Sequence, residues 1–227
     1  LVLSRKFREA IRIEEVRLYL GVILAFTLLI AFNVRDMFGS FFESFHHALF
    51  QVASIITTTG FATVDFNLWP AFSKSLLVLL MFIGACAGST GGGIKCSRIV
   101  LMLKSVKKEM QYLIHPRAVR VNKMDGRRVQ HEVMRSVNVF LIAYLLIFAG
   151  SVLLVSLNCE DMVTNFTAVA TALNNVGPGL ELVGPVENFG FLHPLSKIVL
   201  MFDMLAGRLE LFPMLLLFTP RTWLRKL

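Results

Sequence analysis

Ser54-Ile55-Ile56-Thr57-Thr58-Thr59-Gly60-Phe61 ends an apolar segment that is too short and too polar to cross a membrane. A spanning helix needs about 20 predominantly apolar residues. This segment starts near Phe41 and already contains Glu43, His46 and Gln51. Non-helical backbone at membrane depth is tolerated only where protein buries it or where it lines a cavity. We therefore predict a re-entrant half-helix that ends in a glycine loop.

A weaker copy of this pattern is Thr171-Ala172-Leu173-Asn174-Asn175-Val176-Gly177-Pro178. When the two halves of the chain are aligned, Val52-Ala53-Ser54 matches Val169-Ala170-Thr171. The other matches are Gly60 with Gly177, Ser73-Lys74 with Ser196-Lys197, and Gly84 with Gly207. Each half therefore predicts a crossing, a half-helix, a glycine loop and a second crossing in the same orientation. Parallel repeats of this kind surround an axis along the membrane normal.

Composition supports a polytopic membrane protein and excludes several other classes. The chain has 227 residues, of which 56% are hydrophobic and 17% charged, and its mean hydropathy is +0.68. The net charge of +8 comes from basic residues at segment ends without interleaved aromatics, so we expect no nucleic-acid partner. Three cysteines fit neither a metal spacing nor a disulfide framework. The chain opens without Met, and we expect it to be part of a longer polypeptide.

The distribution of charge and hydrophobicity divides the chain into five parts. They are an amphipathic interfacial segment (1–17), a pore repeat (18–103), a basic linker (104–135), a second pore repeat (136–219) and a tail (220–227). We expect crossings at about 18–34, from 73 onward with an interruption, at about 137–157, and at 195–217. By the positive-inside rule, the linker and both termini are predicted to be cytoplasmic.

The second crossing is predicted to be interrupted between Gly84 and Gly93, because five of these ten residues are glycine. Each glycine costs up to about 1 kcal/mol in a helix interior. A phosphate loop is a poor interpretation, since Ile94 separates Gly93 from Lys95 and no strand precedes the run. We interpret the run as a flexible intramembrane gate with few anchors. A close contact between helices is the alternative. The predicted gate residues are Gly88, Ser89, Thr90, Gly91, Gly92, Gly93, Lys95 and Arg208.

The two glycine loops have the chemistry to bind a dehydrated monovalent cation. Backbone carbonyls can replace the water of the ion, and a glycine permits the backbone conformation that this requires. The C-terminal ends of the half-helices would direct their partial negative charge at the ion. The alternative is that Thr57 to Gly60 merely caps a buried helix. The predicted filter residues are Thr58, Thr59, Gly60, Phe61, Asn175, Val176, Gly177 and Pro178, with the cation at Thr59, Gly60, Val176 and Gly177.

Arg208 lies in the last predicted crossing, where its insertion costs roughly 2.5–3.5 kcal/mol, so we expect it to face the protein interior or a cavity. One interpretation is a positive barrier below the filter. The other is a structural ion pair with Glu210 or Asp203. We interpret Asp203 itself as a packing or pairing residue.

Several of these runs resemble the Trk/Ktr/HKT potassium transporter superfamily. Met81 to Lys95, which includes Gly84-Ala85-Cys86-Ala87-Gly88-Ser89-Thr90-Gly91-Gly92-Gly93, resembles the interrupted helix of that family. Thr57 to Phe61 resembles its third filter, and Asn174 to Gly179 its fourth. His115-Pro116-Arg117-Ala118-Val119 and Gly207-Arg208-Leu209-Glu210 also match. The resemblance covers essentially the whole chain, as the C-terminal half of such a protein.

The resemblance implies an all-α membrane protein with two parallel M1-P-M2 repeats, each a helix, a re-entrant pore helix with a filter loop, and a helix. The family has four such repeats around one potassium pathway, so the implied partners include membrane lipid and the two N-terminal repeats. It also implies a homodimer and a TrkA-like cytoplasmic subunit that binds nucleotide. Potassium would be the only cofactor, with no organic cofactor in this chain.

These observations predict potassium uptake across the plasma membrane of a prokaryote rather than an enzymatic activity. A non-transporting scaffold or regulatory subunit is the alternative, and it predicts no ion at the loops and no flux. An intramembrane enzyme is a third hypothesis. It lacks support, because no Ser, His and carboxylate share a crossing at workable spacing.

Overall fold

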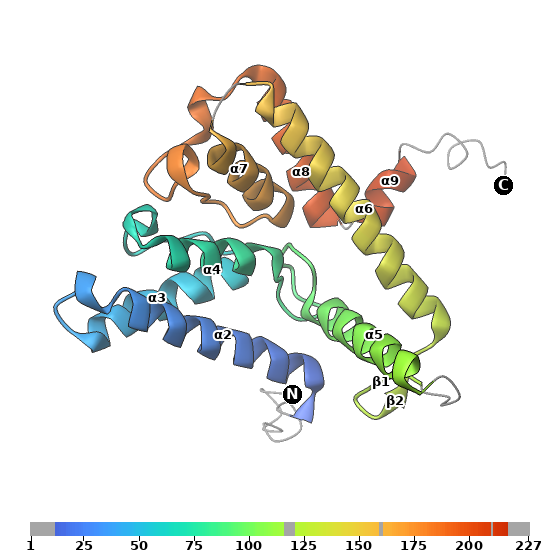
Figure 1. The fold of residues 1–227 in the computed structure, drawn as a ribbon. Helices are drawn as coiled ribbons and strands as arrows, with labels where there is room; N and C mark the ends of the chain where they lie inside the picture. Colours follow the sequence, from blue (N-terminus) through green and yellow to red (C-terminus); the bar gives the residue numbers. More distant parts are fainter. Residues whose placement is uncertain (1–11, 116–120, 159–160, 210, 218–227) are drawn as a thin grey trace.

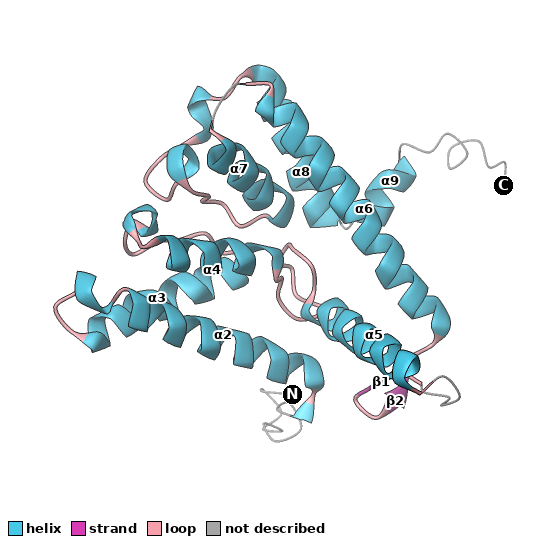
Figure 2. Ribbon diagram, viewed as in Figure 1, coloured by secondary structure: helices cyan, strands magenta, loops and turns pink. Residues whose placement is uncertain are grey.

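The computed structural model of the chain describes residues 12–115, 121–158, 161–209 and 211–217 (Figure 1). Most of the predicted interfacial segment 1–17, the tail 220–227, residues 116–119 of the linker motif and Glu210 lie outside these ranges. The described chain is predominantly helical (Figure 2), which confirms the predicted all-α class. Its two short strands, β1 (Lys123–Met124) and β2 (Arg127–Arg128), form a hairpin in the basic linker.

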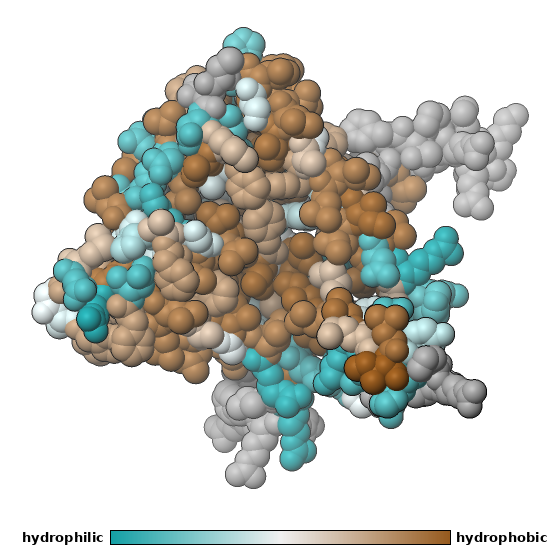
Figure 3. Space-filling view, in the orientation of Figure 1, coloured by the Kyte–Doolittle hydropathy of each residue, from teal (hydrophilic) through white to brown (hydrophobic). Residues whose placement is uncertain are grey.

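Two helices in the described part of the chain are long and apolar enough to cross a membrane. They are α2 (Glu14–Asn33) and α6 (His131–Ser156). Helix α2 begins four residues before the predicted crossing at Leu18, because Glu14 and Glu15 occupy its first turn, where the helix dipole favours acidic side chains. Figure 3 shows large hydrophobic areas on the visible surface. Leu24, Phe32, Leu146 and Leu153 are among the exposed apolar residues, as expected for helices that face lipid.

The two predicted half-helices are α3 (Phe41–Ile56) and α7 (Met162–Asn174). Both begin at a side-chain cap: the Ser40 hydroxyl accepts the Glu43 amide at 3.2 Å, and the Asp161 carboxylate accepts the Val163 amide at 2.9 Å. Helix α3 packs chiefly against α2, and α7 chiefly against α8 (Pro194–Leu209). In Figure 1 the first half of the chain occupies the lower part of the view, with α7 and α8 above it.

The helix that follows the first glycine loop is interrupted over the glycine-rich run, as the sequence predicts. Helix α4 (Ala71–Phe82) and helix α5 (Cys96–Ile114) flank the break. The two arms of the intervening loop are tied at their base, because the Gly84 amide donates to the Ile94 carbonyl and the Ile94 amide to the Phe82 carbonyl, at 2.9 and 3.2 Å. Below, residues 84–94 are called the break loop.

Two boundaries differ from the prediction. Helix α5 continues to Ile114, well into the predicted linker, because its lysines favour helix and no glycine or proline stops it. The predicted last crossing, 195–217, is two helices, α8 and α9 (Leu211–Leu217). Glu210, which lies between the two helices, is outside the described residues.

Candidate functional site

The two predicted filter loops have the same backbone pattern. Thr58 and Asn175, each two residues before the loop glycine, both have a φ of 55°. The glycines themselves, Gly60 and Gly177, have φ values of 80° and 113°. A non-glycine residue in the left-handed region is uncommon, so its recurrence at matched positions shows that the two loops leave their half-helices in the same way.

Matched hydroxyl residues hold the two loops against their half-helices. The amide of Thr59 donates to the carbonyl of Ser54 at 2.8 Å, and the amide of Val176 donates to the carbonyl of Thr171 at 2.9 Å. The Ser54 hydroxyl donates to the Phe61 carbonyl at 2.6 Å. Sequence reasoning used Ser54 and Thr171 only for alignment, although both residues position the predicted filter.

The hydroxyl of Thr171 has a further role in the second loop, because it accepts the Gly177 amide at 2.8 Å. Both Ser54 and Thr171 are buried. Each loop therefore depends on a buried hydroxyl near the C-terminal end of its own half-helix.

The structure brings the four predicted cation-binding positions together. A Cβ atom on Gly60 would collide with the Val176 carbonyl oxygen and come within 3.3 Å of Pro178. A Cβ atom on Gly177 would lie 3.6 Å from the Cα atom of Gly60. Only a glycine at position 60 permits this approach, so the loops from the two halves meet backbone to backbone. Loops that are distant in sequence therefore place their carbonyl groups at one location.

The threonine side chains of the first loop mainly bond to protein atoms. The Thr57 hydroxyl donates to the Ala53 carbonyl at 2.6 Å and lies 2.8 Å from the Thr59 hydroxyl. Thr58 accepts the Gly92 amide at 3.4 Å and so connects the filter loop with the break loop. The side chain of Phe61 is 72% exposed.

The break loop lies against the C-terminal ends of both half-helices. Gly91 is beside Thr58, and a Cβ atom there would lie 3.3 Å from the Thr58 hydroxyl. A Cβ atom on Gly92 would collide with the Asn174 carbonyl at the end of α7, which requires a glycine at this position. A Cβ atom on Gly93 would lie 3.5 Å from the side-chain oxygen of Asn174. The predicted gate residues thus lie directly beside the predicted filter.

Two cationic side chains bond to carbonyl groups of the break loop. Arg208 donates to the Thr90 carbonyl at 2.6 Å, and Lys95 donates to the Ser89 and Gly91 carbonyls at 2.8 and 2.6 Å. Within the described residues, Asp203 is bonded not to Arg208 but to the Ser151 hydroxyl, at 2.8 Å. The alternative partner, Glu210, lies outside the described residues. The break loop therefore has more anchors than its glycine content predicts.

A cavity of about 170 Å³ borders the break loop. Ser89, Thr90 and Gly91 line one side, and Leu173 and Gly207 are among the residues that line the rest. Arg208 also lines it. The loop therefore borders open volume next to the ends of the half-helices.

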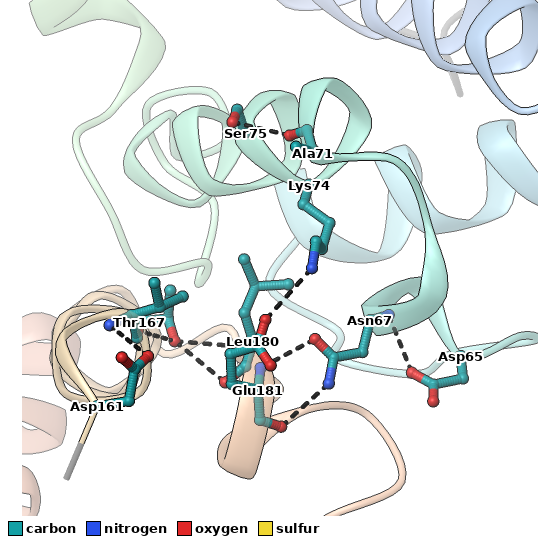
Figure 4. A network of polar contacts seen from close by, with 10 residues as sticks. Asp65, Asn67, Ala71, Lys74, Ser75, Asp161, Thr167, Leu180 and Glu181 are labelled. Atoms are coloured by element: carbon teal, nitrogen blue, oxygen red, sulfur yellow. Dashed lines mark hydrogen bonds and ion pairs between the residues drawn. The ribbon is translucent and has the colours of Figure 1, made fainter.

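Away from the break loop, polar contacts connect the two halves of the chain a second time (Figure 4). The Asn67 side chain accepts the Glu181 amide at 2.9 Å and donates to the Glu181 carbonyl at 3.2 Å. Lys74 forms an ion pair with the Glu181 carboxylate at 3.3 Å. These bonds hold Glu181 at a φ of 52°, and they join the segment after the first filter loop to the segment after the second.

Comparison with known proteins identifies relatives over nearly the whole chain. A family model described as "TrkH: Cation transport protein" matches residues 18–225. The Trk system potassium uptake protein TrkH of Salmonella typhimurium is 39% identical over 227 residues, which cover 98% of this chain and 46% of that protein. The corresponding protein of Vibrio parahaemolyticus is 40% identical over 206 residues, which cover 91% of this chain and 42% of that protein.

The fold agrees with a solved structure of the same kind. The crystal structure of the potassium transporter TrkH from Vibrio parahaemolyticus matches with a TM-score of 0.86 at 39% identity, and the match covers 94% of this chain and 46% of that chain. The chain thus spans less than half the length of the relatives it matches.

Proposed function

The chain belongs to the TrkH family of cation transport proteins, and from this membership we propose that it forms the C-terminal half of a potassium uptake protein. Its two M1-P-M2 repeats contribute half of a channel-like pore. In the first repeat these parts are α2, α3 with its loop, and the interrupted helix α4–α5. In the second they are α6, α7 with its loop, and α8–α9.

The meeting of Gly60 with Val176 and Gly177 is the observation that carries this proposal. The two loops have matched backbone conformations. They meet at Gly60, which has no room for a side chain, and at Gly177, whose φ of 113° disfavours one. A scaffold that only packs helices has no need for two loops of the same backbone conformation at matched positions. A potassium ion that sheds its water does need the carbonyls of such loops, and the C-terminal ends of α3 and α7 add a favourable negative potential.

In this proposal the break loop is the gate of the pore. It lies against the ends of both half-helices, and Arg208 adds a positive charge to the same place through its bond to Thr90. A loop held at this level obstructs an ion that leaves the filter. Its displacement opens the path, and the adjoining cavity offers volume into which it can move.

Half of a ring cannot enclose an ion, so the remaining carbonyls come from two N-terminal repeats of the same protein. We further propose that the intact protein is a homodimer in the plasma membrane of a prokaryote, with the basic linker and both termini on the cytoplasmic side. A TrkA-like cytoplasmic subunit binds nucleotide and regulates the gate. The basic residues of the hairpin, Lys123, Arg127 and Arg128, agree with the cytoplasmic orientation.

Potassium flux from the intact protein in liposomes tests the proposal. Gly60→Ser and Gly177→Ser should reduce the preference for potassium over sodium by at least about tenfold, because a side chain in either loop displaces the carbonyls that replace the hydration shell. Gly150→Ser is the matched control, since Gly150 has no atom within 4 Å of its Cβ position. Unchanged selectivity in both filter variants would refute the filter assignment. No flux from the intact wild-type protein would favour a scaffold.

A further inference from the structure

Glu15 is a buried carboxylate that belongs to neither filter loop and accepts hydrogen bonds from the break loop. It lies in the first turn of α2 and is only 8% exposed. One of its oxygen atoms accepts the Ala87 amide at 2.6 Å and the Ser97 amide at 2.9 Å. Ala87 belongs to the break loop, and Ser97 is the second residue of α5. A single side chain of α2 thus holds the loop and the helix that follows it.

The chemistry of these two bonds makes them strong. The first amides of a helix have no partner within the helix, so the Ser97 amide requires an external acceptor. Glu15 supplies it and places a negative charge at the positive end of the α5 dipole. Hydrogen bonds to an ionised acceptor are roughly twice as strong as those between neutral groups. Burial of the carboxylate is costly, and these bonds offset that cost.

The position of Glu15 is itself fixed by neighbouring contacts. Asp125 of the β1–β2 hairpin accepts the Glu14 amide at 2.8 Å. Lys104 of α5 bonds to the Glu14 carboxylate and donates to the Lys123 carbonyl at 2.6 Å. The first turn of α2 is therefore attached to the hairpin and to α5, and Glu15 projects from that rigid base to Ala87.

We propose that Glu15 is the positioning residue that locks the break loop in its closed place. Lys95 and Arg208 bond to residues 89–91 of the loop, whereas Glu15 holds its opposite arm at Ala87. The lock needs an acceptor that reaches both amides at once, which a glutamate or glutamine does and a shorter side chain does not. The expected effect on transport rests on the proposed function, in which this loop is the gate. The anchoring of Ala87 by Glu15 is independent of that function.

The reactivity of the Cys86 thiol reports how firmly Glu15 holds the break loop, and it does so independently of transport. Cys86 precedes Ala87 and is partly exposed, while Cys96 is buried. The intact protein in detergent is treated with N-ethylmaleimide, and modification is quantified for each cysteine peptide by mass spectrometry. Potassium flux of the same variants is measured in liposomes without added regulatory subunit. The variants are Glu15→Ala, Glu15→Asp and Glu15→Gln, with Glu109→Ala on the exposed side of α5 as the matched control.

We expect Glu15→Ala and Glu15→Asp to raise the Cys86 modification rate and the basal potassium flux by about tenfold or more, because the loop loses two charge-assisted bonds. Glu15→Gln should give smaller increases than Glu15→Ala, since its amide oxygen still accepts both bonds, although without the negative charge. Glu109→Ala should change neither quantity. If Glu15→Ala fails to accumulate, Glu15→Asp provides the same comparison with a carboxylate retained.

The two measurements separate the possible failures. Unchanged Cys86 reactivity in both Glu15→Ala and Glu15→Asp would overturn the lock. Equal increases of the Cys86 modification rate in Glu15→Gln and Glu15→Ala would overturn the claim that the bonds from the Ala87 and Ser97 amides hold the loop. Raised Cys86 reactivity with unchanged flux would overturn the role of Glu15 in transport, and with it the assignment of the break loop as the gate.

Discussion

Thr171 shows how one hydroxyl group can determine the path of a filter loop. Its Oγ1 atom accepts the Gly177 amide at 2.8 Å, and its carbonyl accepts the Val176 amide at 2.9 Å. The residue is 1% exposed, so bulk water does not reach the hydroxyl. The same helix offers a contrast, because the buried Thr164 hydroxyl has no partner among the described residues.

Thr171→Val is therefore expected to reduce the free energy of unfolding by roughly 1–3 kcal/mol, because it leaves the Gly177 amide buried without an acceptor. It should also lower the preference for potassium over sodium, since Gly177 loses its support. Thr164→Val should be neutral or stabilising by comparison. Thermal unfolding of the intact protein and ion flux in liposomes measure the two effects. Equal losses in the two variants would contradict the role of Thr171.

Sequence reasoning identified glycine positions but not the residues that support them. Gly60 and the run around Gly92 are recognisable because glycine is costly within an apolar helix and its presence needs a reason. Glu15 gave no such signal, since an acidic residue at a helix start is common and its partners are backbone amides 72 and 82 residues away. Asn67 was missed for the same reason, as its partner is the backbone of Glu181.

At the scale of elements, hydrophobic patterning located the helices better than their ends. The half-helix α7 begins at Met162, directly after Asp161, because the Asp161 carboxylate caps it. In contrast, α5 runs past the predicted boundary at Leu103, since charged residues end a hydrophobic run without ending a helix.

The contact between Asn67 and Glu181 joins two short helices, η2 (Phe66–Leu68) and η3 (Glu181–Val183), from different halves of the chain. Asn67→Ala should destabilise the intact protein by about 1–2 kcal/mol, because it removes two hydrogen bonds that hold Glu181 in a left-handed conformation. Asn188→Ala is the control, since among the residues that the structure describes the Asn188 side chain accepts only the nearby Gly190 amide. Thermal unfolding in detergent measures both. A smaller loss for Asn67→Ala than for Asn188→Ala would contradict a coupling of the halves.

At the scale of the whole molecule, the described helices pack in two groups that meet at the two glycine loops. Hydrophobic clusters join α2, α3 and α4 on one side and α6, α7 and α8 on the other, with Val176 and Leu180 packed into the first cluster. The two halves are thus interlocked at the filter. The alignment of the halves predicts two parallel repeats. The contacts between the two loops could not be predicted from it, because they depend on the relative placement of separate helices.

The chain alone should give no potassium-selective flux in liposomes, because two filter loops cannot surround an ion. Co-reconstitution with the N-terminal half of the same protein should restore flux to within about tenfold of the intact protein, the remaining loss reflecting incomplete association of the two parts. A fluorescent potassium indicator inside the liposomes provides the measurement, with the intact protein as the positive control. Potassium-selective flux from the isolated chain would contradict the proposal that it supplies only half of the filter.

The Glu15 lock also has a consequence for biosynthesis. Its two bonds join residues separated by 72 and 82 positions, whereas the bond of Arg208 to Thr90 spans 118. A nascent chain that has emerged only as far as α5 already contains every atom of the lock, but neither Arg208 nor the second filter loop. Because membrane segments leave the ribosome in order, we expect the break loop to be fastened before the ion path exists. An incompletely synthesised protein would then already hold the break loop in its closed position. The reactivity of Cys86 in ribosome-bound chains that end after α5 would test this.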